Sequence, residues 1–223
     1  MKRAELAKLI DHTALGPTAT AADIKQICTE ARRDGFAAVC VSPYHVPLAG
    51  QLLAESEVKV CTVIGFPHGC NVGPVKAMET KQAIDDGADE LDMVINIAAL
   101  KQGDYHIVLD EIQLVSRAIE KCPRPLLLKI ILETTLLTTE EKIAGAILAK
   151  AAGADFVKTS TGFAQGGATV EDVSLLRRTV GKMIGVKASG GIRDYHTAIA
   201  MIEAGATRIG TSSGPVILHG AEE

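Results

Sequence analysis

The sequence predicts an α/β fold: a TIM (β/α)8 barrel in which residues 1–223 form a single domain with a short extra N-terminal helix. Three observations support this fold. Apolar segments typical of buried parallel strands alternate with helical segments, a helix–glycine–strand junction recurs, and the length suits eight such units, which need about 250 residues or fewer. An open doubly wound sheet is the alternative. It is disfavoured because no Gly-x-Gly-x-x-Gly motif follows the first strand.

The recurring junction occurs four times, at Arg33–Val39, Asp86–Leu91, Ala152–Val157 and Ala204–Ile209. Each copy has the end of a helix, a glycine suited to the left-handed position after a helix, and the start of an apolar strand. This pattern is half of a βα unit, so its repetition indicates a fold built from repeated units.

Eight strands are expected along the chain, several of them nearly continuous apolar runs, as buried parallel strands should be. They are Leu9–Thr13, Ala37–Ser42, Lys59–Phe66, Glu90–Ile95, Leu126–Glu133, Phe156–Thr161, Ile184–Ser189 and Arg208–Ser213. The stretch before Leu9 is expected to be the extra helix, covering the bottom of the barrel.

Capping signals mark the starts of several helices. Thr20–Asp23, Thr138–Glu141 and Thr169–Asp172 resemble capping boxes, and Asp104 is placed to cap a longer helix. Residues expected on the buried faces of these helices are Ile24, Ile27, Cys28 and Ala31, then Val108, Ile112, Val115 and Ile119, and then Ile143, Ile147, Leu148 and Ala151.

Composition restricts the function classes. The formal net charge is −4 and no block of like charge stands out, which disfavours a nucleic-acid partner. No run of about 18 uncharged apolar residues indicates a membrane span, and the first residues do not resemble a signal peptide. Five cysteines without a Cys-x-x-Cys pair are typical of reduced thiols. We therefore expect a cytoplasmic enzyme with no membrane partner.

Four strands each carry one charged residue among apolar neighbours: Asp92, Lys129, Lys158 and Lys187. Any one of these alone would be interpreted as an edge or snorkelling residue. Successive strand side chains point to opposite faces, and the apolar neighbours must pack against the helices. All four charges should therefore enter the barrel interior. Asp11 and Glu133, which shares the parity of Lys129, are expected to join them near the carboxyl ends of the strands.

Such a cluster suits amine catalysis. A desolvated lysine that is partly neutral can attack a carbonyl and form a Schiff base, and a second ammonium nearby lowers the pKa of a nucleophilic lysine. A carboxylate within reach can carry protons. Lys158, Lys187 and Asp92 are therefore the candidate nucleophile, pKa modulator and proton carrier. A purely structural buried ion network would give a similar sequence, so this alternative stays open.

Glycine-rich segments follow the last two strands. Ser189–Asp194 follows the seventh strand and Gly210–Gly214 ends the eighth, where TIM barrels commonly bind phosphate through backbone N–H groups. Gly162 is a further candidate donor, and Arg193 is either an accessory positive charge or a helix-face residue. The alternative is that these glycines only form tight turns. His68 and Cys70 lack the spacing of a metal site, so we expect no metal and no cofactor.

The motifs at Leu9–Thr13, Val63–Pro67, Glu90–Val94, Val157–Gly162, Val186–Arg193 and Gly210–Ser213 together resemble those of the deoxyribose-phosphate aldolase family. The resemblance covers nearly the whole chain. It implies a metal-free class I aldolase that reversibly cleaves 2-deoxy-D-ribose 5-phosphate into D-glyceraldehyde 3-phosphate and acetaldehyde through a lysine Schiff base. It also implies a homodimer acting on small phosphorylated sugars and aldehydes in deoxyribose catabolism.

By this resemblance, Lys158 forms the Schiff base, and Asp92 and Lys187 exchange protons through bound water. The implied substrate-binding residues are Asp11, Thr13, Cys40, Gly162, Gly190, Gly191, Ser212 and Ser213. Two departures concern Phe163, where some family members carry a lysine, and the segment His219–Glu223, which lacks the C-terminal tyrosine of some members. One alternative is another phosphate-binding TIM-barrel enzyme, either a different Schiff-base aldolase or a sugar-phosphate isomerase. The other is a non-catalytic barrel that senses a phosphorylated metabolite.

Overall fold

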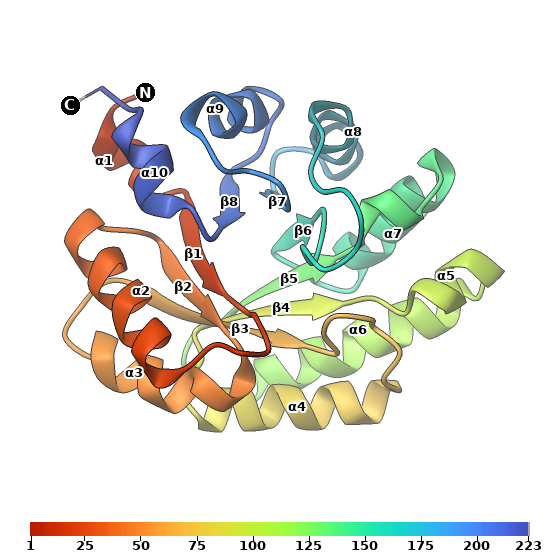
Figure 1. The fold of residues 1–223 in the computed structure, drawn as a ribbon. Coiled ribbons are helices and arrows are strands. Elements are labelled where there is room, and N and C mark those ends of the chain that lie inside the picture. Colours follow the sequence, from red (N-terminus) through yellow and green to blue (C-terminus); the bar gives the residue numbers. More distant parts are fainter. Residues whose placement is uncertain (223) are drawn as a thin grey trace.

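The computed structural model describes residues 1–222 and forms a closed barrel of eight parallel strands in the order β1 to β8, with helices around the outside (Figure 1). The predicted fold class is thus confirmed. The strands are β1 (Ile10–Ala14), β2 (Ala38–Val41), β3 (Lys59–Ile64), β4 (Glu90–Val94), β5 (Leu127–Ile131), β6 (Phe156–Lys158), β7 (Gly185–Ser189) and β8 (Arg208–Thr211).

Ten α-helices and two 3₁₀ turns connect the strands within the described residues. The helices are α1 (Arg3–Ala7), α2 (Ala21–Asp34), α3 (Val46–Leu53), α4 (Gly73–Asp85), α5 (Ile97–Gln102), α6 (Tyr105–Glu120), α7 (Thr139–Ala151), α8 (Val170–Val180), α9 (Tyr195–Glu203) and α10 (Gly214–His219). The turns are η1 (Pro43–His45) and η2 (Thr134–Leu136). None of the helices in residues 1–222 is both long and apolar enough to cross a bilayer.

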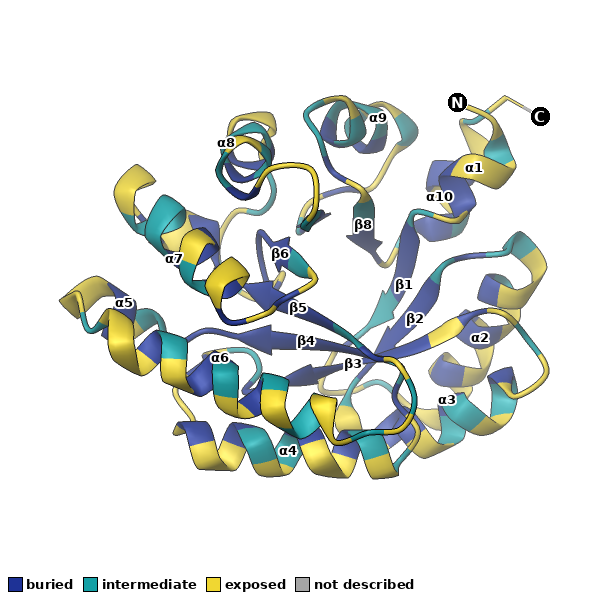
Figure 2. Cartoon of the chain, turned by 180° about the vertical axis from the view of Figure 1, so that it is seen from behind, coloured by how far each residue is buried: buried dark blue, intermediate teal, exposed yellow. Residues whose placement is uncertain are grey.

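All eight predicted strands are present, but most are shorter at their carboxyl ends than the apolar runs suggested. The predicted strand Phe156–Thr161, for example, is observed only over Phe156–Lys158. Beyond these points the chain leaves the sheet and forms the loops at the carboxyl ends of the strands. Figure 2 shows the strands almost uniformly buried, whereas the helices expose their outer faces.

The extra N-terminal helix is observed as α1, which lies beside α10 close to the two ends of the chain (Figure 1). The Arg3 guanidinium donates to the carbonyl of Leu218 in α10, at 3.1 Å. The buried residues of α1 are Leu6 and Ala7. Arg3 also pairs with Asp34, the last residue of α2, at 3.3 Å, so α1 lies beside the carboxyl ends of α2 and α10, near the amino ends of the strands.

The glycine junctions lead into reciprocal clamps at the amino ends of the strands. The backbone N–H of Asp89 donates to the carbonyl of Val60, and the Asp89 carboxylate accepts the N–H of Val60 at 3.0 Å. Asp155 forms the same pair of bonds with Leu128, and Thr207 forms them with Val186. Each clamp satisfies a buried strand amide that the ladder leaves without a partner at this edge. We call these three pairs the floor clamps.

The predicted capping boxes are present at Thr20 and Thr138. At Thr169 only half of the box forms: the hydroxyl accepts the N–H of Asp172, whose carboxylate accepts from Lys142 instead of returning the bond. Asp104 occupies the position before α6, but its side chain makes no capping hydrogen bond, so that prediction was wrong. The short helix α5 ends at Gly103 immediately before it. The N–H of Asp104 donates to the carbonyl of Ala99, which ties this residue to the end of the preceding helix.

The predicted buried face of α7 was also wrong. Ile147 is 52% exposed, whereas Gly145, Ala146 and Ala149 are buried. Packing explains this difference, because a Cβ at Gly145 would lie 3.1 Å from a methyl group of Leu132. The helix approaches the barrel so closely that small residues must face inward, although apolarity alone favours the isoleucines.

Candidate active site

A cavity of about 600 Å³ opens at the carboxyl ends of the strands. Its lining comes mainly from the segments after β1, β6, β7 and β8, together with the start of α2. Lys158, at the end of β6, is the only lysine among the lining residues in the described part of the chain. The cavity is therefore large enough for a small metabolite and has one primary amine in its wall.

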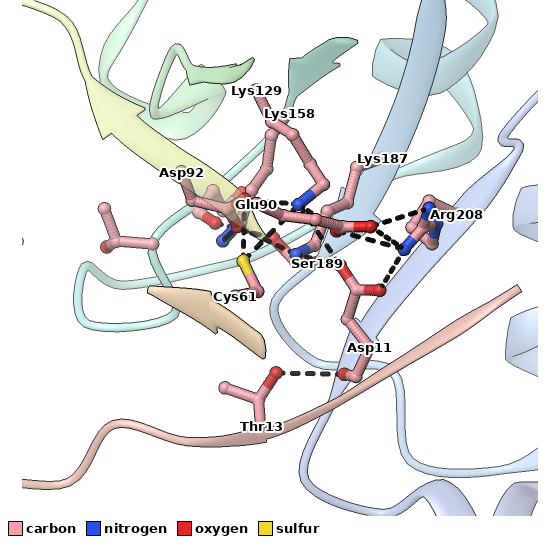
Figure 3. A network of polar contacts seen from close by, with 12 residues as sticks. Asp11, Thr13, Cys61, Glu90, Asp92, Lys129, Lys158, Lys187, Ser189 and Arg208 are labelled. Carbon is pink, nitrogen blue, oxygen red and sulfur yellow. Dashed lines mark hydrogen bonds and ion pairs between the residues drawn. The ribbon is translucent and has the colours of Figure 1, made fainter. Parts of the chain in front are cut away.

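Below this cavity the barrel interior contains a dense network of ion pairs (Figure 3). Asp92 lies at its centre, with one carboxylate oxygen 2.7 Å from Lys158 Nζ and 2.8 Å from Lys187 Nζ. The other oxygen lies 2.9 Å from Lys129 Nζ. One carboxylate thus contacts three ammonium groups, and all four inward-pointing charges predicted from the sequence meet at this point.

A second layer of the network extends to the amino ends of the strands. Lys187 Nζ lies 2.5 Å from Asp11, and Lys129 Nζ lies 2.6 Å from Glu90. The Arg208 guanidinium contacts both acids, at 2.6 Å from Asp11 and 3.2 Å from Glu90. We call these seven residues the ion network: Asp11, Glu90, Asp92, Lys129, Lys158, Lys187 and Arg208.

Strand register explains why these side chains converge. Asp92 pairs with Lys129 between β4 and β5, and Lys158 pairs with Lys187 between β6 and β7. Lys158 pairs on its other side with Ile131, two residues beyond Lys129, so it is displaced towards the carboxyl ends of the strands. This stagger brings the Lys158 amine to the cavity while Lys129 stays in the interior.

The mutual contacts of the network fix the charges of its acids. Burial acts to raise the pKa of Asp92, but the nearby Lys129, Lys158 and Lys187 outweigh it and hold the pKa well below its usual range. The pKa of Asp11 is likewise lowered, because Lys187, Arg208 and Lys129 outweigh burial. Both groups are therefore carboxylates at neutral pH.

The cations respond in the opposite direction. Burial acts to lower the pKa of Lys187, but Asp11 and Asp92 outweigh it and raise the pKa above its usual value. Asp92 similarly raises the pKa of Lys129 despite its burial, and Asp11 and Glu90 raise that of Arg208. These three cations stay protonated, so Lys187 is a donor of hydrogen bonds and a fixed positive charge.

Two buried thiols lie beside Asp92. Cys40 and Cys61 occupy paired positions on β2 and β3, and the Cys61 thiol donates to Asp92 at 3.2 Å. Burial and the neighbouring Cys40 raise the pKa of the Cys61 thiol. The ligand atoms of Cys40, Cys61 and Asp92 lie within 4.8 Å of one another. A metal ion does not fit here, however, because three ammonium groups already contact Asp92.

Glu133 does not join the ion network, contrary to the prediction. Strand β5 ends at Ile131, and Glu133 has a left-handed backbone with φ of 59°, so the alternation that places Lys129 inward no longer applies. Its carboxylate instead accepts hydrogen bonds from the N–H of Thr161, at 3.1 Å, and from the Thr161 hydroxyl. Glu133 thereby holds the loop that follows Lys158.

The expected binding residues occupy two levels of the site. The cavity lining includes Thr13, Gly162, Gly190, Gly191 and Ser212. Asp11 and Cys40 are fully buried below it, and the N–H of Ser213 donates to the Thr211 hydroxyl at 2.9 Å.

The lining glycines have backbones suited to anion binding. Gly162, Gly190 and Gly191 have φ values of 85°, 90° and 80°, which side chains rarely allow. Within residues 1–222 the N–H groups of Gly162, Gly191 and Ser212 have no intramolecular acceptor. Arg193, which also lines the cavity and is exposed, adds a positive charge to the same rim.

Phe163 is half exposed and lines the cavity. Its ring packs edge-to-face on Phe66, from the loop after β3, with the centroids 5.2 Å apart. At this position a lysine would supply charge to the cavity, whereas Phe163 joins two loops across the rim.

Three residues without a predicted role lie in or beside the ion network: Glu90, Cys61 and Arg208. Glu90 could have been found, because it lies two residues before Asp92 and so faces the same side of β4. Arg208 opens β8, where a charge is ordinarily taken as solvent-exposed, and its contacts depend on how the barrel closes.

A sequence model of the DeoC/LacD aldolase family matches residues 6–219. This chain belongs to that family. It is an aldolase, a carbon–carbon lyase on a TIM barrel. It is 58% identical to the deoxyribose-phosphate aldolase of Carboxydothermus hydrogenoformans, over 97% of this chain and 95% of the relative. It is 59% identical to that of Thermococcus gammatolerans, over 97% and 96% of the two chains.

The structural comparison agrees. The aldolase superposes on the tetrameric deoxyribose phosphate aldolase of Aeropyrum pernix with a TM-score of 0.89 and 35% identity, covering 97% of this chain and 91% of that one. The barrel fold is thus shared with a solved deoxyribose phosphate aldolase.

Proposed function

We propose that this aldolase cleaves 2-deoxy-D-ribose 5-phosphate into D-glyceraldehyde 3-phosphate and acetaldehyde through a Schiff base on Lys158. The observation that carries the proposal is the position of Lys158: among residues 1–222 it is the one lysine in the cavity wall, and it contacts a network of fixed charges. The names of its relatives support the choice of substrate. The reverse reaction joins the same two aldehydes.

The reaction begins when the neutral amine of Lys158 attacks the C1 aldehyde of the sugar. Loss of water from the carbinolamine gives an iminium ion, which withdraws electrons from the C2–C3 bond. Removal of the C3 hydroxyl proton then breaks this bond, releasing D-glyceraldehyde 3-phosphate and leaving an enamine. Protonation at C2 and hydrolysis release acetaldehyde and restore the lysine.

The network assigns different roles to Asp92 and Lys187. Asp92 is held as a carboxylate, so it can accept a proton from the substrate directly or through water. Lys187 is held as an ammonium, so it can donate a hydrogen bond and stabilise negative charge on an oxygen. The substrate phosphate binds the N–H groups of Gly162, Gly191 and Ser212, with Arg193 as an additional positive charge.

The deciding experiment is borohydride reduction of the protein mixed with 2-deoxyribose 5-phosphate, followed by mass spectrometry of the peptides. We expect a reduced adduct on Lys158 and none in Lys158→Leu. In Lys187→Met, which keeps an unbranched side chain up to Cε but removes the charged nitrogen, an adduct should form slowly and turnover should fall at least about a hundredfold. An adduct on Lys187, or no adduct on the wild-type protein, would show that the assignment of Lys158 is wrong.

The cellular setting is part of the same proposal. We infer that the enzyme acts in the cytoplasm in deoxyribose catabolism, as a homodimer that needs neither metal nor cofactor. Size-exclusion chromatography with light scattering measures the oligomeric state.

A further inference from the structure

Glu90 and Arg208 form an ion pair at the amino ends of the strands, remote from the cavity opening. Neither residue lines the cavity. The Glu90 side chain is 4% exposed and the Arg208 side chain 12% exposed. Arg208 also lies over the ring of Phe156, 5.6 Å from its centroid, which fixes the guanidinium beneath the network. The desolvation of a buried ion pair has a high free-energy cost, so stability alone does not explain the presence of this pair.

The cations of the ion network differ in how many carboxylates they contact. Lys129 contacts Asp11, Glu90 and Asp92, at 3.8, 2.6 and 2.9 Å. Lys187 and Arg208 each contact two carboxylates. Within residues 1–222, Lys158 contacts one carboxylate, Asp92, and it shares that carboxylate with two other ammonium groups. Lys158 is therefore the least compensated cation of the network.

The charges of the network are unequal in number. Four basic groups (Lys129, Lys158, Lys187 and Arg208) face three carboxylates (Asp11, Glu90 and Asp92) within residues 1–222. An unbalanced charge in a buried site has a high free energy. The cation with the fewest neighbouring carboxylates therefore gives up its proton, and with it the charge, most readily. We propose that Glu90 and Arg208 are positioning residues that set this balance, so that Lys158 is the lysine that gives up its proton.

The other titratable groups that face Lys158 do not alter this count. Strands β2 and β3 contribute the thiols Cys40 and Cys61, and burial raises the pKa of Cys61, which favours its neutral form. Cys40 is the other thiol beside Asp92, so the Cys40→Ser background serves as a control for its charge. Strands β4, β5, β7 and β8 contribute only members of the ion network. Strand β1 contributes Asp11 and also His12, which lines the cavity and pairs with Glu30 of α2 at 2.7 Å. Glu133, from the loop after β5, is bonded to Thr161. Removing the charge of Glu90 should therefore favour the neutral form of Lys158, whereas removing the charge of Arg208 should favour its protonated form.

This inference rests on the proposed function, because the readout is imine formation on Lys158. The experiment measures how the initial rate of borohydride-trapped adduct formation depends on pH, using 2-deoxyribose 5-phosphate. The neutral amine is the reactive form, so this rate rises with pH around a midpoint. Circular dichroism and thermal unfolding confirm that each variant is folded.

Arg208→Met leaves three cations facing three carboxylates, so Lys158 should hold its proton and the midpoint should rise by about one pH unit, as expected for one nearby charge. Glu90→Gln leaves four cations facing two carboxylates, so the midpoint should fall by about one unit. The double variant has three cations and two carboxylates, the same excess of one cation as the wild-type protein, so its midpoint should return towards the wild-type value. Arg208→Lys keeps the charge and should leave it unchanged.

Opposite shifts of the two single variants support the charge balance, because simple damage to packing would slow both reactions without moving their midpoints apart. Shifts of the same sign, or no shift in variants that still form the adduct, would overturn the inference. If Arg208→Met does not fold, the comparison of Glu90→Gln with the double variant decides the question. Failure of the proposed function is distinct, since the wild-type protein itself would then form no adduct on Lys158.

Discussion

Gly210 in β8 provides a test of how tightly Lys187 is positioned. A Cβ at this residue would lie 3.0 Å from Lys187 Cε and 2.9 Å from Ser189 Cβ. Carbon atoms prefer separations of about 3.5–4.0 Å, so each contact in Gly210→Ala would be short by roughly half an ångström or more. The conformation of Gly210 is not in the left-handed region, so the effect of the methyl group is steric alone.

The expected cost has two parts. Overpacking in a well-packed interior destabilises a protein by about 1–3 kcal/mol, so the free energy of unfolding should fall by that amount. Displacement of the Lys187 ammonium from Asp11 and Asp92 should lower kcat by about ten- to a hundredfold, since small misplacements near a reacting centre carry costs of this size. Urea unfolding measures the first effect, and steady-state cleavage of 2-deoxyribose 5-phosphate measures the second.

Gly50→Ala is the matched control. Gly50 lies in α3, and a Cβ there has no atom within 4 Å. Alanine is favoured over glycine in helices by about 1 kcal/mol, so stability should stay the same or rise, and kcat should not change. If Gly210→Ala retained both the stability and the kcat of the wild-type protein, the close packing of Lys187 would not matter for the reaction.

Three further predictions concern the phosphate, metal ions and acid. Ser212→Asp should raise KM for 2-deoxyribose 5-phosphate far more than for deoxyribose, and equal effects on the two sugars would show that phosphate binds elsewhere. Excess EDTA should leave activity unchanged, since three ammonium groups already contact Asp92; activity lost to EDTA and restored by Zn²⁺ would contradict this. The lowered pKa values of Asp11 and Asp92 stabilise the fold at pH values above about 4, the unfolded-state pKa, and this stabilisation is lost as the pH falls further. Urea unfolding at constant ionic strength should thus show stability falling from about pH 5 to pH 3, and a flat profile would contradict it.

The sequence predicted the barrel well because its signals are local. Strand alternation correctly placed Asp92, Lys129, Lys158 and Lys187 in one interior, and this inference needed only the period of two in a strand. Three-dimensional packing decided the features that were missed. The face of α7 that carries Gly145 is buried because the helix lies so close to the barrel that only small residues fit between them.

Backbone geometry and barrel closure explain the remaining differences in the site. The left-handed backbone at Glu133 ends the alternation, which the residue type does not signal. The contacts of Arg208 with Asp11 and Glu90 depend on the stagger between β8, β1 and β4. The spacing of residues along one strand does not predict how far neighbouring strands are shifted relative to one another. Arg208 could therefore not be assigned to the ion network from the sequence.

The floor clamps strengthen three of the seams between neighbouring strands, so these seams should open later than the matching seam that lacks a clamp. They join β3 to β4, β5 to β6 and β7 to β8, each through a backbone bond and a returning side-chain bond. Between β1 and β2 the corresponding residue is Ala37, whose N–H donates to Ile10 without a side chain to return the bond. A returning bond contributes about 1 kcal/mol, so the β1–β2 seam should open locally before the three clamped seams. Amide hydrogen exchange at the amino ends of the strands would show this seam losing protection before the three clamped ones.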